Sequence, residues 1–165
     1  MLLAVFRSHN ERYAIGVSSI VEVIPLVKLY NMPNTPDYFA GIFDYRGEPT
    51  PVLDLSMLTS GDISRNSIST RIMMISYQDE QGNNKIMGLK AEQLTDTMKC
   101  AMEEFKSFGS NTKSNHFVAG LRKDEEGFIH LIDLKKLISN DIIHSLFGIT
   151  RHPVQTGDAH EMLAK

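Results

Sequence analysis

Two segments of the chain repeat the same order of glycine, apolar and aspartate residues. The first runs from Gly41 to Asp54 and the second from Gly120 to Asp133, so glycine and aspartate are 13 residues apart in both. In each segment two apolar residues precede the aspartate and a leucine follows it. A chain that repeats a unit in this way is expected to fold into two similar halves.

Residues upstream of these two segments echo one another as well. Three groups keep the same internal spacing in both copies: Tyr13-Ala14-Ile15, Ile20 and Glu22 return as Met87-Gly88-Leu89, Leu94 and Asp96. The offset between the copies differs by five residues between the upstream and downstream parts, so we expect a longer connection within the second half. The alternative to a structural repeat is a chance match of short apolar patterns.

Short apolar segments alternate with clusters of Gly, Pro, Asn and Ser, which is typical of a chain with many short strands. We expect strands at residues 2–6, 13–17, 39–45, 51–55, 71–77, 117–121 and 128–134. Polar residues 59–70 predict a surface connection between the halves. Since halves of about 75 residues bury little apolar surface alone, we expect a mainly β fold in which two small barrels share a core.

Two stretches predict short helices. Ser19-Ile20-Val21-Glu22 has the spacing of a capping box, but Pro25 follows too soon for more than about one helical turn. Apolar residues between Leu134 and Phe147 have a partial helical spacing, which predicts a helix near the C-terminus. We therefore expect one domain over residues 1–147 and a polar C-terminal tail over residues 148–165.

Composition excludes several classes of protein. The chain has 17 Lys and Arg against 20 Asp and Glu, a net charge of −3, so no basic surface for nucleic acid is expected. No apolar run reaches the roughly 20 residues that span a bilayer. The start of the chain lacks the features of a signal peptide, and Cys100 is the single cysteine, so we expect a cytoplasmic protein in which Cys100 packs as a small buried hydrophobe.

Motifs for metals and cofactors are missing from the sequence. The chain has six histidines, and none of them forms a His-x-x-x-His pair of the kind that binds zinc on a helix. No phosphate-binding loop, dinucleotide-binding glycine pattern or nucleophile elbow is present. We therefore predict no metal, no cofactor and no catalytic residue.

Asp54 and Asp133 are the one pair of carboxylates that the repeat could bring together. They could act as general acid and base in a minor hydrolase, or line a barrel that binds a small ligand. The favoured interpretation is that each carboxylate caps the turn that follows its strand. By the same reasoning, the charged run Arg122–Glu126 is interpreted as a solvated hairpin tip. An oligonucleotide-binding barrel would need a basic groove with aromatic platforms, which the composition does not supply.

The turn Tyr45-Arg46-Gly47-Glu48 is the remaining candidate site. Glycine allows the positive φ of a tight turn, which would hold the Arg46 guanidinium at a sheet edge where its planar donors can engage a carboxylate. Glu22 is the candidate carboxylate. The alternative is a solvated turn arginine without a specific partner.

At these residues the sequence resembles the CheW family of chemotaxis coupling proteins. The matching segments occur in the family's order: Tyr13-Ala14-Ile15, Val21-Glu22-Val23, Met32-Pro33, Gly41-Ile42, Tyr45-Arg46-Gly47, Pro51–Leu55, Arg71–Ile75, Met87-Gly88-Leu89, Val118–Leu121 and Ile129–Leu134. The resemblance covers roughly residues 2–147. Its most specific part is the block from Gly41 to Leu55.

The resemblance implies two five-stranded SH3-like β-barrels packed around a shared hydrophobic centre, and no catalysis. Proteins of this family are scaffolds that bind the regulatory domain of a CheA-type histidine kinase and the cytoplasmic tip of a chemoreceptor. The resemblance therefore implies a cytoplasmic adaptor that receptor arrays recruit to the inner face of the membrane. The partner-contact positions that it implies are Ile20, Glu22, Val23, Gly41, Arg46 and Gly47.

The chain departs from the family pattern at two places. Asp44-Tyr45 stands where many members have Asn-Leu, and Ile24–Val27 is more apolar than its usual equivalent. Both features are similar to those of couplers in Wsp-type systems, in which the kinase output controls a diguanylate cyclase rather than a flagellar motor. The departures leave the identity of the receptor and kinase open.

Overall fold

A computed structural model describes residues 1–107 and 115–151 of the chain. The fold is mainly β, as the sequence predicts. In chain order its elements are β1 (Leu2–Ser8), β2 (Glu11–Gly16), the 3-10 helix η1 (Val17–Ser19), β3 (Ile20–Pro25), β4 (Phe39–Tyr45), β5 (Glu48–Asp54), α1 (Leu55–Ser60), β6 (Arg71–Gln78), β7 (Asn84–Lys99), the 3-10 helix η2 (Met102–Glu104), β8 (Val118–Asp124), β9 (Gly127–Ile132), α2 (Leu134–Leu137) and α3 (Asn140–Arg151).

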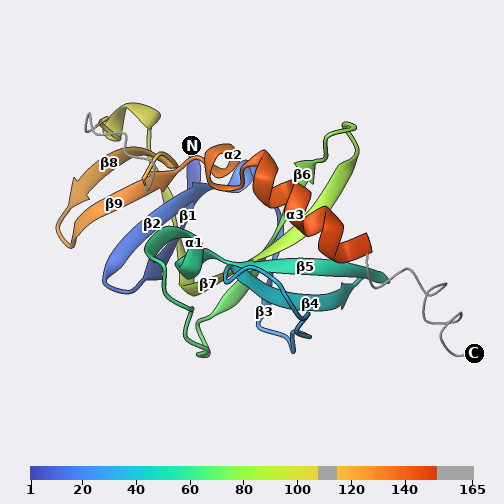
Figure 1. Cartoon of the computed structure of the whole chain (residues 1–165). Coiled ribbons are helices and arrows are strands. Elements are labelled where there is room, and N and C mark those ends of the chain that lie inside the picture. Colours follow the sequence, from blue (N-terminus) through green and yellow to red (C-terminus); the bar gives the residue numbers. More distant parts are fainter. Residues whose placement is uncertain (108–114, 152–165) are drawn as a thin grey trace, which may run out of the picture.

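Strand β7 is long enough to belong to two sheets (Figure 1). Its first half pairs with β6 and β5, and its second half pairs with β1. Barrel 1 therefore contains β3, β6, the first half of β7, β5 and β4, whereas barrel 2 contains the second half of β7, β1, β2, β9 and β8. The pairing changes from β6 at Ala91 to β1 at Glu92, next to Gln93, whose φ of 47° marks a break in the regular strand.

The strand registers confirm the repeat. In barrel 1, Val52 of β5 lies opposite Gly88 of β7 in a parallel pair. In barrel 2, Leu131 of β9 lies opposite Ala14 of β2, also in parallel. The sequence echo relates Val52 to Leu131 and Ala14 to Gly88, so the two barrels use equivalent positions in equivalent pairs.

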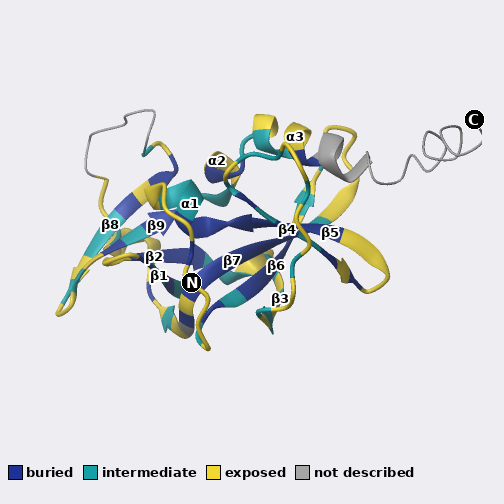
Figure 2. Ribbon diagram, turned by 60° about the horizontal axis from the view of Figure 1, so that its bottom comes forward, coloured by how far each residue is buried: buried dark blue, intermediate teal, exposed yellow. Residues whose placement is uncertain are grey.

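Three apolar clusters hold the barrels together, and the largest lies between them. The shared centre draws on both barrels and on the C-terminal helices, and its fully or almost fully buried members include Phe6, Ile15, Leu53, Leu55, Met73, Met87, Leu89 and Leu146. The interior of barrel 1 is formed by Phe43, Tyr45, Val52, Ile72 and Met74. The interior of barrel 2 is formed by Leu3, Ala14, Cys100, Ile129 and Leu131, so Cys100 packs as a buried apolar residue as predicted. Figure 2 shows buried residues along the central strands and exposed residues at the hairpin ends.

The helices in the structure lie at other positions than the predicted ones. In this region the 3-10 helix η1 covers only Val17–Ser19 and β3 begins at Ile20, so the prediction of a helical bend over residues 19–22 is wrong. The β-branched residues of this segment favour a strand, and pairing with β6 outweighs the local capping signal. Near the C-terminus, α2 and α3 replace one helix, and α3 continues past residue 148, where we expected the tail to begin. Residues 152–165 of that tail lie outside the described residues, as do residues 108–114, which follow η2 in the sequence.

Within residues 1–107 and 115–151, no helix has the length and apolar character to cross a membrane.

Candidate functional site

The β4–β5 hairpin ends in a two-residue turn formed by Arg46 and Gly47 (Figure 1). Both residues have positive φ, 53° and 85°, which is the backbone of a type I′ turn. The Gly47 amide donates to Oδ1 of Asp44 at 2.7 Å and stabilises the turn. A Cβ at Gly47 would meet no atom within 4 Å, so glycine is favoured here by backbone conformation and not by space.

The turn places Arg46 against the carboxylate that the sequence predicts. Nη2 of Arg46 donates to Oε1 of Glu22 at 3.2 Å, and the guanidinium carbon lies 5.0 Å from the centre of the Tyr45 ring. The Tyr45 hydroxyl donates to the same Oε1. Glu22, Tyr45 and Arg46 therefore form one network, which we call the Glu22 network, and Tyr45 is a member that the sequence analysis did not assign.

Tyr45 joins this network to the interior of barrel 1. Its side chain is almost fully buried, and its ring lies 6.0 Å from that of Phe43. The hydrogen bond to the Glu22 carboxylate, followed by burial, raises the pKa of Tyr45 above its ordinary value. The phenol is consequently a protonated donor at neutral pH.

Strand β3 exposes apolar side chains on the face opposite to Glu22. Among the described strands it pairs with β6 alone, and its exposed positions alternate with half-buried ones. Val21 and Val23 are 44% and 46% exposed, whereas Ile20 packs against the shared centre. Val23 is therefore available to a partner, and Ile20 serves mainly to fix β3.

Gly41 has a different environment from the other predicted contact residues. It is buried with φ of 145°, and a Cβ there would lie 2.8 Å from Cβ of Leu29 and 3.0 Å from the Tyr30 carbonyl oxygen. Two hydrogen bonds between the backbones of Tyr30 and Ile42, at 2.8 and 2.9 Å, hold the segment that contains Leu29 and Tyr30 against β4. Gly41 therefore allows the backbone at Leu29 and Tyr30 to pack closely against β4. The structure brings together Glu22, Arg46 and Gly47 at the surface, places Val23 on the opposite face of β3 from Glu22, and places Ile20 and Gly41 beneath the surface.

Asp54 and Asp133 cap two separate helices, as the favoured interpretation predicts. Asp54 accepts hydrogen bonds from the first amides of α1 at 3.0 and 3.3 Å, and Asp133 accepts from those of α2 at 3.1 and 3.4 Å. Asp54 also accepts from the amide and hydroxyl of Ser64, which anchors the connection after α1. The two carboxylates therefore cap different helices, α1 and α2.

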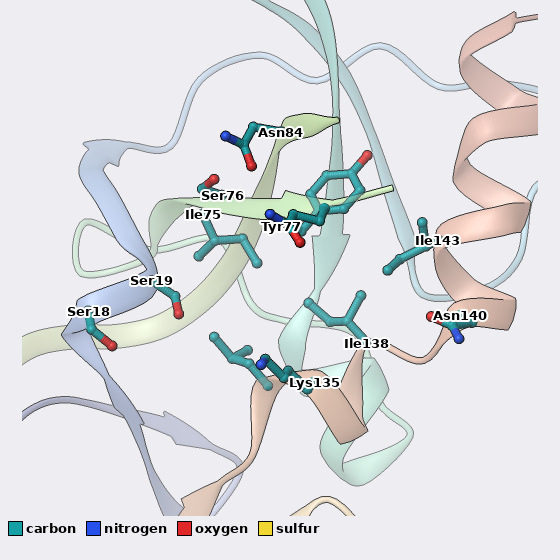
Figure 3. A pocket seen from close by; sticks show the side chains of 12 residues that line it. Ser18, Ser19, Ile75, Ser76, Tyr77, Asn84, Lys135, Ile138, Asn140 and Ile143 are labelled. Atoms are coloured by element: carbon teal, nitrogen blue, oxygen red, sulfur yellow. The ribbon is translucent and has the colours of Figure 1, made fainter. Parts of the chain in front are cut away.

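A cavity of about 640 Å³ lies between barrel 1 and the C-terminal helices (Figure 3). It is lined by Ser18, Ser19, Ile75, Ser76, Tyr77, Gln78, Asn84, Leu134, Lys135, Ile138, Asn140 and Ile143. The lining contains one cation and no carboxylate, and its serine, lysine and amide side chains are exposed to water. Its lining therefore offers no pair of carboxylates for general acid–base catalysis.

Asp124, within the run Arg122–Glu126, forms an ion pair with Arg12 that the sequence analysis missed. Arg12, which is 9% exposed, donates to both oxygens of Asp124 and, at 3.2 Å, to the carbonyl of Gly127. The hydrogen bonds from Arg12 are the main cause that lowers the pKa of Asp124 to about 2. In the repeat, Asp124 occupies the position equivalent to Tyr45, since each follows its glycine, Gly120 or Gly41, at the same distance.

In the part of the chain that the structure describes, no group of three or more His, Cys, Asp or Glu side chains is placed to hold a metal ion.

Comparisons with known proteins agree with the fold. The model of the CheW-like domain family matches residues 3–141. The chain is 20% identical over 133 residues to a chemotaxis protein CheW of Helicobacter pylori, covering 80% of this chain and 78% of the relative. It is 23% identical over 141 residues to a chemotaxis protein CheW of Bacillus subtilis, covering 84% and 87%.

A solved structure shares the architecture. The scaffolding protein TtCheW from Thermoanaerobacter tengcongensis superposes with a TM-score of 0.71 and 22% sequence identity, covering 86% of this chain and 89% of that one. The similarity supports the assignment of two SH3-like barrels.

Proposed function

Because the chain belongs to the CheW-like domain family, whose model spans residues 3–141, we propose that it is a non-catalytic scaffold. Its proposed partners are the cytoplasmic tip of a chemoreceptor and the regulatory domain of a CheA-type histidine kinase. Coupling then requires only that both proteins dock on the same chain, so that receptor conformation biases kinase activity. The names of the relatives, chemotaxis proteins and a scaffolding protein, support this role.

The observation that carries the proposal is the Glu22 network at the edge of barrel 1. A cation and a carboxylate with side chains 66% and 37% exposed are fixed at the edge strand β3, whose other face exposes Val21 and Val23. Apolar contacts supply affinity and a placed charge pair fixes orientation, which is the arrangement suited to docking an amphipathic segment. We assign the docking function to residues 1–147, because all the proposed docking residues lie within residues 3–141, which the family model matches.

The test is the charge reversal Arg46→Glu. It replaces the attraction to Glu22 by repulsion while leaving the buried residues of barrel 1 in place, so we expect at least a tenfold loss of affinity for one partner or both. Binding is measured by pull-down and calorimetry with the kinase and receptor of the same organism. Lys135→Glu is the matched control because it makes the same charge change on α2, outside the site.

Two results would count against the proposal. A folded Arg46→Glu variant that binds both partners as tightly as the wild type contradicts the role of the turn. A wild-type chain that binds neither a receptor nor a kinase contradicts the scaffold itself.

The proposal has two more specific parts, which are where in the cell the protein acts and which process the kinase controls. A scaffold that docks on receptors is recruited to receptor arrays at the inner face of the membrane, where a fluorescent fusion would co-localise with the receptor. Deletion of the gene separates the two outputs: altered swimming indicates a flagellar motor, and altered cyclic diguanylate levels indicate a Wsp-type system.

A further inference from the structure

Two donors of the β4–β5 hairpin converge on a single oxygen of Glu22. The Tyr45 hydroxyl and the Arg46 guanidinium both donate to Oε1, and within the described chain Oε2 accepts no hydrogen bond. An arginine side chain has five N–H donors, of which Arg46 uses one in this bond. Most of its hydrogen-bonding capacity therefore points away from Glu22, on a side chain that is 66% exposed.

The Tyr45 hydroxyl connects β4 to β3, two strands of barrel 1 that are not hydrogen-bonded to each other in the described sheet. Strands β3 and β4 do not pair with each other in the described sheet, so side chains must hold Glu22 against the hairpin. The ring of Tyr45 is fixed by the barrel interior, and the hydroxyl therefore has a fixed position. That position fixes Glu22, and Glu22 together with the ring face fixes Arg46.

We propose that Tyr45 is a positioning residue for docking, which aims the free donors of Arg46 at a carboxylate of the partner. The inference rests on the proposed function, since it assigns the chemistry recognised at the same site. A planar guanidinium that is already oriented binds a carboxylate with two parallel hydrogen bonds and loses little side-chain entropy on binding. The partner segment accordingly carries an aspartate or glutamate at the position that meets Arg46.

Removal of the Tyr45 hydroxyl tests the positioning of Arg46 without changing the packing of the Tyr45 ring. Tyr45→Phe keeps the ring in the barrel interior and keeps the ring face beneath Arg46. Glu22 and Arg46 are then left as an exposed ion pair, a type of contact that holds neither side chain in one geometry. We expect affinity for the partner to fall about fivefold to tenfold.

A double-mutant cycle tests whether Tyr45 acts through Arg46. Affinities for the full-length kinase and for the receptor are measured by calorimetry for the wild type, Tyr45→Phe, Arg46→Ala and the double variant. We expect Tyr45→Phe to weaken binding in the wild-type background and to have no further effect beside Arg46→Ala. An equal loss in both backgrounds overturns the proposal, because it assigns Tyr45 a structural role independent of Arg46.

Tyr13→Phe is the control, since Tyr13 is also almost fully buried and its hydroxyl interacts with Thr59, away from the Glu22 network. It should leave both affinities unchanged. A loss equal to that of Tyr45→Phe would overturn the proposal by showing that any buried phenol has the same effect.

A spectroscopic measurement on the free protein keeps the proposal testable without a partner. Rotation of the Arg46 guanidinium, followed by 15N NMR of the side-chain nitrogens, should be slow in the wild type and faster in Tyr45→Phe. Equal rotation in the two proteins overturns the proposal. If the wild type bound neither kinase nor receptor, the proposed function would fail, and the NMR result would still decide whether Tyr45 positions Arg46.

Discussion

The ion pair between Arg12 and Asp124 predicts a specific dependence of stability on pH. The hydrogen bonds from Arg12 lower the pKa of Asp124 from 3.8 to about 2. A shift of this size corresponds to about 2.4 kcal/mol at most. The Asp124 side chain is 30% exposed and solvent screens the pair, so we expect a contribution of about 1–1.5 kcal/mol to the free energy of unfolding. Asp124→Asn should remove it at pH 7.

The sign of the shift fixes the pH window. Because the folded state holds the pKa of Asp124 below its unfolded value, the stabilisation is complete above about pH 4 and is lost as the pH falls towards 2. Urea denaturation of wild type and Asp124→Asn between pH 7 and pH 2.5 gives the difference in free energy of unfolding. That difference should shrink below pH 4. The exposed Asp37→Asn is the control and should show no such change.

One result would refute this reasoning. If the difference between wild type and Asp124→Asn stayed constant from pH 5 to pH 2.5, the carboxylate of Asp124 would not be the source of the stabilisation. Arg12 would then act through the Gly127 carbonyl or through packing.

Two further predictions concern backbone geometry and capping. Gly41→Ala should lower the free energy of unfolding by more than about 2 kcal/mol, because its Cβ would press on the Tyr30 carbonyl; Gly61→Ala, with positive φ but open space, should cost only about 1 kcal/mol. Asp54→Ala should cost about 2–4 kcal/mol and Asp133→Ala about 1 kcal/mol, because Asp54 is buried and accepts four hydrogen bonds while Asp133 accepts two. Thermal and urea denaturation measure both pairs, and equal costs within either pair would contradict the explanation.

Much of the architecture could be predicted from the sequence, because the repeat and the turn residues are local signals. Spacing alone predicted the β4–β5 hairpin and the two capping aspartates. The length of β7 could not be predicted in this way. A strand continues for as long as neighbouring strands pair with it, and the partners of β7 come from distant parts of the chain.

The candidate site was predictable to a similar extent. The glycine of the turn indicated where Arg46 would lie, and Glu22, which we expected at a helical bend rather than in a strand, was its candidate carboxylate. Tyr45 was not assigned because its role depends on a buried ring and a hydroxyl that reaches another strand. Arg12 and Asp124 are 112 residues apart, so only the folded topology brings them into contact.

The order of strands along the chain also has a consequence for synthesis on the ribosome. Barrel 1 is built from consecutive strands β3 to β7, so it can assemble once the chain has emerged to the middle of β7. Barrel 2 combines β1 and β2 with β8 and β9, and the β1–β2 hairpin must therefore wait for the last strands before its outer edge is paired. Pairing between distant segments is slow, and an unpaired edge is open to aggregation during that interval. Barrel 2 is therefore the half of the nascent protein that most needs protection by chaperones.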